Sequence, residues 1–98
     1  MKISKLHRTD KETAKVKLDG FLPDLMERFG EAALIGKPTW QGDVMHFGIQ
    51  ARGLSITGSA EVNDTEVSIE LALPMIARVF EGRIRSGIER RLDQTFGA

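Results

Sequence analysis

The feature that most constrains the fold is the run from Thr39 to Pro74, in which apolar and polar residues alternate almost without interruption. Alternation with a period of two is typical of a β-strand with one buried face. Short polar groups typical of turns break the run at 41–42, 52–53 and 63–65. The run therefore predicts an antiparallel β-meander. Leu73-Pro74 then predicts the change to a helix, because proline is favoured in the first helical turn.

The turns also predict the strand register, since a shift by one residue would move every side chain to the other face of the sheet. A two-residue turn at Arg52-Gly53 pairs Phe47 with Gly58. A four-residue loop at 63–66 then pairs Gly58 with Leu71. We expect these two large neighbours to cover the gap left by the glycine.

One helix is predicted before the meander in the sequence and another after it. Thr9 and Glu12 have the spacing of a capping box, which predicts a helix start. Apolar residues at helical spacing continue to Gly30, a typical helix stop. Pro23 lies within this pattern, so we expect a kink there or two short helices.

The predicted C-terminal helix has an apolar stripe that one flat sheet cannot bury. Each step of four residues overshoots a helical turn by about 40°, so the stripe rotates by roughly 200°. We expect a bend at Gly82 or Gly87, or a last turn that leans on the first helix or on a partner chain. Burial of Leu92 and Phe96 would contribute roughly 3 to 6 kcal/mol, which motivates a homodimer through this helix. The stripe consists of Ile76, Phe80, Ile84, Ile88, Leu92 and Phe96.

The fold class that follows is α+β. A short strand at 2–7 and a strand at 34–40 complete the meander, and Pro38 places the second of these at an edge of the sheet. We predict an antiparallel β-meander of about four to five strands packed by an N-terminal and a C-terminal helix, in the order β-α-β-β-β-β-α. Residues 1–98 are expected to form a single domain, because a chain of this length cannot support two cores.

The composition argues against several functions. The absence of Cys removes disulfides, thiolate nucleophiles and Cys-based zinc sites. The net charge is zero, and pairs such as Glu81 with Arg85 offset the arginines of the last helix, so nucleic-acid binding is not expected. No apolar run is long enough for a membrane span or a signal peptide. We expect a cytoplasmic protein without a cofactor or a metal.

Three polar residues of the meander have the side chains of a hydrolase triad. The register puts His46, Ser59 and Glu70 in one cross-strand row, with Ser59 in the middle. Neighbouring strands lie ~5 Å apart, so the carboxylate would be about 10 Å from the imidazole that it should orient. Ser59 also lacks a Gly-x-Ser-x-Gly elbow. We predict a solvated or helix-covered polar face and no catalytic residues. A hydrolase of hydroxyacyl esters would need His46 or Ser59 beside a pocket.

Trp40 is the residue whose role is most open. Next to the turn at Gln41-Gly42, it either closes the edge of the core or lines a groove for an apolar ligand or partner. We group it with Phe47, Leu92 and Phe96 as the candidate ligand or partner surface.

Short motifs over nearly the whole chain carry a family resemblance. They are His7 with Thr9 and Glu12, Trp40-x-Gly42-Asp43 with Phe47, the mid-strand Gly58, Leu73-Pro74, and Ile84, Ile88 and Leu92. In these the chain resembles the polyhydroxyalkanoic acid system family, small proteins also described as polyhydroxyalkanoate granule region proteins. It departs from the family pattern at Arg8 and Pro23. The resemblance implies a bacterial origin and a link to storage-polyester metabolism, and it transfers no active-site residues.

Two function hypotheses from different classes follow. The first is a non-enzymatic accessory or binding protein in polyester granule physiology, with the granule or a granule-associated protein as its partner. The alternative is a small apolar-ligand-binding protein of a reduced helix-grip type, in which the sheet and the last helix hold an apolar molecule. Residues such as Met26, Met45 and Met75 suit such a lining and are equally common in an ordinary core.

Overall fold

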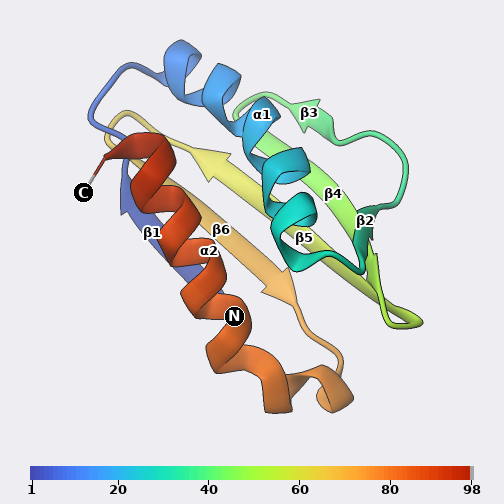
Figure 1. The fold of residues 1–98 in the computed structure, drawn as a ribbon. Helices are drawn as coiled ribbons and strands as arrows, with labels where there is room; N and C mark the ends of the chain where they lie inside the picture. Colours follow the sequence, from blue (N-terminus) through green and yellow to red (C-terminus); the bar gives the residue numbers. More distant parts are fainter. Residues whose placement is uncertain (98) are drawn as a thin grey trace.

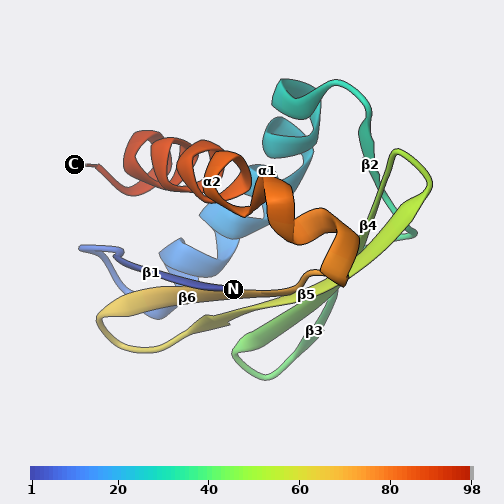
Figure 2. The same cartoon turned by 90° about the horizontal axis from the view of Figure 1, so that it is seen from below.

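The computed structural model describes residues 1–97, which form two layers: an antiparallel sheet and two helices on one of its faces (Figures 1 and 2). The predicted α+β class, a meander between an N-terminal and a C-terminal helix, is confirmed. The elements are β1 (Lys2–Leu6), α1 (Lys11–Phe29), β2 (Ala32–Leu34), β3 (Thr39–Gln41), β4 (Val44–Ala51), β5 (Leu54–Val62), β6 (Glu66–Ala72), the 3₁₀ helix η1 (Met75–Phe80) and α2 (Glu81–Phe96).

The predicted register of the meander is confirmed. Phe47 faces Gly58 across β4 and β5, and Gly58 faces Leu71 across β5 and β6. The turn residues Arg52 and Gly53 have φ values of 51° and 76°, as a two-residue type I′ hairpin requires. A Cβ atom on Gly58 would lie 2.6 Å from the Phe47 ring and 2.7 Å from Leu71. The two large side chains therefore fill the space above this glycine, as expected.

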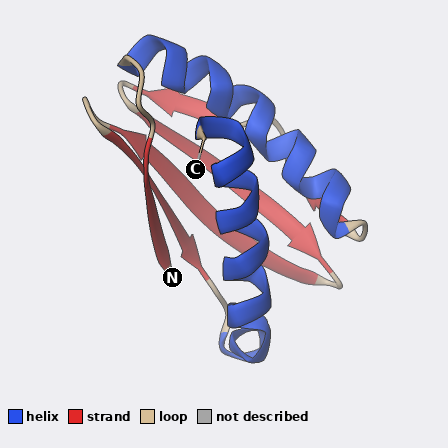
Figure 3. Cartoon of the chain, turned by 60° about the vertical axis from the view of Figure 1, so that its left-hand side comes forward, coloured by secondary structure: helices blue, strands red, loops and turns tan. Residues whose placement is uncertain are grey.

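The two edges of the sheet differ in how well the sequence predicts them. β1 pairs antiparallel with β6, which confirms the N-terminal strand. The strand predicted at 34–40 is instead divided into β2 and β3, which pair with different parts of β4. Gly36, with φ 68°, lies between them together with Pro38, which has no N–H to donate. The sheet therefore has six strands, in the order β1-β6-β5-β4-β2 with β3 beside β4 (Figure 1). Figure 3 shows both helices on the same side of this sheet.

The predicted capping box of α1 is wrong by one residue. The N-cap is Asp10, whose carboxylate accepts a hydrogen bond of 2.7 Å from the Thr13 amide. The Thr9 amide instead donates to Nδ1 of the buried His7, at 3.2 Å. Both Thr9 and Asp10 are good capping residues, and the contact with His7 decides between them.

α1 continues as one helix through Pro23 and ends at Gly30, where the expected stop is confirmed. The alternative of two short helices is therefore wrong. Proline removes one helical hydrogen bond, but Pro23 is exposed, so water can reach the backbone on that side. The opposite side of the helix, with Leu22 and Leu25, is buried against the sheet, and such packing supplies most of a helix's stability.

The C-terminal segment is a 3₁₀ helix, η1, up to Phe80 and an α-helix, α2, from Glu81, and α2 continues through Gly82 and Gly87. The change divides the apolar stripe: Ile76 is 68% exposed, whereas Leu92 and Phe96 are only 1% and 4% exposed. The predicted docking of the last turn on the first helix is confirmed. The Lys17 ammonium of α1 lies 5.8 Å from the centre of the Phe96 ring. The side chains that motivated a homodimer are thus buried within one chain.

Candidate functional site

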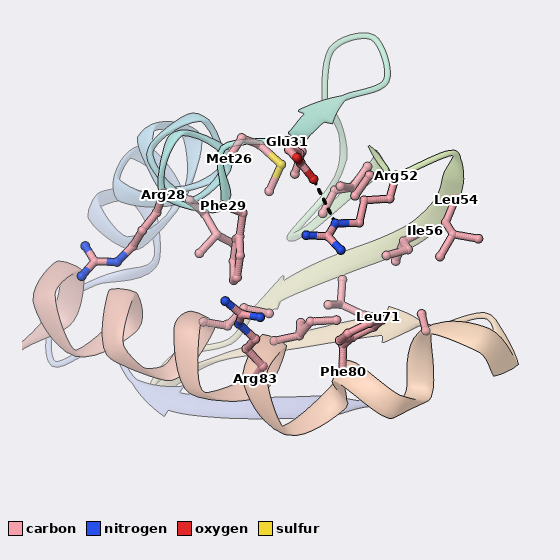
Figure 4. Close-up of a pocket in the computed structure, with 17 residues that line it drawn as sticks. Met26, Arg28, Phe29, Glu31, Arg52, Leu54, Ile56, Leu71, Phe80 and Arg83 are labelled. Carbon is pink, nitrogen blue, oxygen red and sulfur yellow. Dashed lines mark hydrogen bonds and ion pairs between the residues drawn. The ribbon is translucent and has the colours of Figure 1, made fainter.

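An apolar cleft opens between the two helices, above the end of the sheet where the β4–β5 hairpin turns (Figure 4). Its volume of about 450 Å³ lies within the range of roughly 300–1,000 Å³ that is typical of small-molecule sites. The last turn of α1, the inner side of η1 and the first turns of α2 form its walls. The apolar lining includes Ile49, Ile56, Leu71 and Ile88 toward the core and Met26, Phe29 and Phe80 toward the mouth.

The polar side chains around the mouth of the cleft are mainly cationic. Nε of Arg52 donates to the Glu31 carboxylate at 2.9 Å, but the two side chains are 71% and 70% exposed, so the pair contributes little stability. Arg83 makes no ion pair with any of residues 1–97. Figure 4 shows its guanidinium over the cleft, whereas that of Arg28 points away. Arg83 and Arg52 against the single Glu31 favour an anionic group at this mouth.

Phe29 is placed over the cleft by a close approach of the helices. A Cβ atom on Gly87 of α2 would lie 2.6 Å from the Phe29 ring, closer than packed atoms approach, so glycine is what allows the ring to rest against α2. The Arg91 guanidinium and the Asp24 carboxylate join the same two helices at 2.9 Å. The helix pair that frames the cleft is therefore fixed by both packing and charge.

An exposed apolar surface adjoins the cleft. Four side chains of η1 project into solvent, and we call them the η1 patch: Met75, Ile76, Val79 and Phe80, which are 82%, 68%, 80% and 45% exposed. Phe80 also lines the cleft, so the patch and the cleft are continuous. Single exposed apolar residues are common on protein surfaces, whereas a contiguous group marks an interaction surface.

None of the four residues predicted as a ligand or partner surface lines the cleft, and all four belong to the hydrophobic core or pack against it. Phe47, Leu92 and Phe96 are buried in the core, with 8%, 1% and 4% of their surface exposed. Trp40 is half-buried at the other end of β4. Contact of these residues with a ligand stays a prediction, and the three buried side chains would first have to be uncovered.

Trp40 and Asp43 tie the β3–β4 hairpin to α1. The indole Nε1 of Trp40 donates to the Asp19 carboxylate at 3.0 Å, and the Lys15 ammonium lies 5.5 Å from the centre of its ring. The Asp43 carboxylate pairs with both Lys11 and Lys15 at 2.7 Å. The motif Trp40-x-Gly42-Asp43 therefore has a structural role, and Trp40 closes the edge of the core.

The ion pairs of Asp43 predict how the free energy of unfolding depends on pH. Hydrogen bonds from Lys11 and then Lys15 lower the pKa of Asp43 from 3.8 to about 2. Because the folded carboxyl has the lower pKa, its contribution is present above pH 3.8 and is lost as the pH falls toward 2. We expect Asp43→Asn to lower the free energy of unfolding at pH 7 and to lose this difference by pH 2. Urea unfolding at several pH values measures it, and a difference independent of pH would contradict the assignment.

The second face of the sheet is polar and carries neither helix (Figure 2). The predicted row of His46, Ser59 and Glu70 is confirmed by the strand pairing, and it borders a shallow hollow of about 270 Å³. Ser59 lies between the other two, so the carboxylate cannot orient the imidazole as a triad requires. Within residues 1–97, no group of three or more His, Asp or Glu side chains is arranged to hold a metal ion.

The fold and the cleft define a small two-layer α+β protein with an apolar site between its helices and its sheet. The chain belongs to the family described as "Putative polyhydroxyalkanoic acid system protein", whose model matches residues 1–96. The resemblance in its short motifs is thus confirmed over nearly the whole chain. No curated protein and no solved structure matches it. Within residues 1–97, no helix has the length and apolar character needed to cross a membrane.

Sequence reasoning did not find Phe29, Phe80 and Arg83 as residues of a site. The available signal was the rotating apolar stripe, which contains more apolar residues than one face of the helix can bury. The sequence prediction assigns this excess to the C-terminal end, at Leu92 and Phe96. The structure places the excess at the N-terminal end, in η1, because the chain changes from a 3₁₀ helix to an α-helix after Phe80.

Proposed function

We propose that this protein is a non-enzymatic accessory protein of polyhydroxyalkanoate metabolism that attaches to the surface of the stored polyester through the η1 patch. The observation that carries the proposal is the exposure of four large apolar side chains within the six residues of η1: Met75, Ile76, Val79 and Phe80. Membership of the family supports the link to the polyester system. Attachment to stored polyester places the protein in the cytoplasm of a bacterial cell.

The physical basis of attachment is removal of apolar side chains from water. Full burial of one such side chain contributes roughly 1.5–3 kcal/mol. Four such side chains lie within η1, which is six residues long. Arg78 lies within η1 beside the patch and is also exposed. Apolar side chains flanked by basic ones are typical of segments that lie on an apolar surface with an anionic boundary.

Co-sedimentation with polyester granules tests the proposal. The wild-type protein should sediment with granules from a polyester-accumulating cell, and Met75→Ser with Val79→Ser should lower its affinity for them by about tenfold or more. Val16→Ser is the matched control, because Val16 is 71% exposed on α1, outside the patch. This control should bind as the wild type does.

Two results would contradict the proposal. A wild-type protein that remains entirely in the soluble fraction under accumulating conditions would reject attachment to granules. Binding to native granules but not to purified, protein-free polyester would identify a granule-associated protein, rather than the polyester, as the partner.

A second candidate function, binding of a small apolar ligand, is favoured by the cleft. A closed core would have counted against it, whereas the space between the helices and the sheet measures about 450 Å³. The sheet and α2 contribute to the lining, as a reduced helix-grip arrangement requires, and α1 supplies the remaining wall. The row of His46, Ser59 and Glu70 lies on the other face of the sheet, which supports binding rather than catalysis in the cleft.

A further inference from the structure

We propose that the cleft binds a single aliphatic chain that ends in a carboxylate, and that Arg83 and Arg52 hold the carboxylate at the mouth. This inference rests on the second candidate function and specifies its ligand. It is independent of granule attachment, because neither arginine belongs to the η1 patch. The hydrocarbon part and the carboxylate part of the ligand are inferred from two separate properties of the cleft.

The apolar end follows from the lining. The charged side chains that line the cleft within residues 1–97 are Arg28, Glu31, Arg52 and Arg83, and all four are exposed at its rim. Below the rim, the side chains are aliphatic or aromatic, with Ile56, Leu71 and Ile88 continuing into the core. A polar group placed there would lose its water without gaining a hydrogen bond, which is costly. The inserted part of the ligand is therefore a hydrocarbon.

The anionic end follows from the arginines. Arg83 and Arg52 direct their guanidinium groups toward the space above the cleft (Figure 4). Arg83 has no acidic partner within residues 1–97, and the partner of Arg52, Glu31, is held only by an exposed pair. A guanidinium group matches the planar fork of a carboxylate. Attraction beside an apolar wall is also less screened than in bulk water. A carboxylate that enters with its chain would satisfy both cations.

Titration calorimetry with simple amphiphiles tests both ends of the ligand, at concentrations below those at which they form micelles. From hexanoate to octanoate to decanoate, the affinity should rise by roughly fourfold for each added methylene group. Octanoate should bind about tenfold more tightly than 1-octanol, because the alcohol cannot form the charge-assisted hydrogen bonds. Undetectable binding of decanoate to the wild type, or equal binding of octanoate and 1-octanol, would overturn the proposal.

Two exposed arginines of α2 provide a matched pair of variants. Arg83→Gln should lower the affinity for octanoate about tenfold and leave the affinity for 1-octanol unchanged. Arg90→Gln changes an exposed arginine outside the cleft and should alter neither. If Arg83→Gln lowers the affinities for octanoate and 1-octanol equally, Arg83 does not bind the carboxylate. Because Arg83→Gln retains the η1 patch and the Met75, Val79 variant retains both mouth arginines, failure of ligand binding is distinguishable from failure of granule attachment.

Discussion

Replacing Leu92 and Phe96 together with serine is expected to unfold the protein rather than to separate a dimer. Both side chains are almost fully buried, with 1% and 4% of their surface exposed. Truncating a buried Leu costs about 2–5 kcal/mol and a buried Phe about 3–5 kcal/mol. The sum is comparable to the total stability of a domain, about 5–15 kcal/mol. Circular dichroism should therefore show the loss of both helical and β signal at 25 °C, or a large drop in the urea midpoint.

The matched control for this variant is Met75→Ser with Ile76→Ser, which also exchanges two large apolar residues for serine. These residues are 82% and 68% exposed, so their replacement should change the free energy of unfolding by no more than about 0.5 kcal/mol each. A Leu92, Phe96 variant that stays folded while its mass by light scattering falls by half would show that these side chains serve a dimer interface.

The meander could be predicted from the sequence because its determinants are local. Arg52-Gly53 allows one hairpin geometry, and the period of two then assigns each side chain to a face. The register at Phe47, Gly58 and Leu71 follows from the turn without knowledge of any helix. The division of 34–40 into β2 and β3 was harder to predict from the sequence, since it depends on how Gly36 and Pro38 fit the outer edge of β4.

The helix ends and the cleft depend on contacts between distant segments. Thr9 and Asp10 are equivalent as capping residues by local preference, and His7 distinguishes them through the tertiary structure. The position of the cleft depends on where the chain turns after Phe80, which decides whether Ile76 or Leu92 enters the core. Spacing alone identifies an apolar stripe too wide for one face, but it does not say which end remains exposed.

Replacing His7 with alanine is expected to lower the free energy of unfolding by about 2–4 kcal/mol, the sum of a lost hydrogen-bond pair and a small cavity. The His7 ring is 1% exposed. Its Nδ1 accepts from the Thr9 amide at 3.2 Å, so Nε2 carries the proton and donates to the Asn63 carbonyl oxygen at 2.8 Å. One side chain thus joins the end of β1, the β5–β6 loop and the start of α1.

The second histidine provides the control for this prediction. His46 is exposed on the polar face of the sheet, and His46→Ala should change the free energy of unfolding by no more than about 0.5 kcal/mol. Urea unfolding of both variants at pH 7 measures the difference. Equal effects would mean that the hydrogen bonds of His7 add nothing to the fold. A large effect at His7 alone would explain, from packing and hydrogen bonding, why a histidine belongs to the motif at the start of α1.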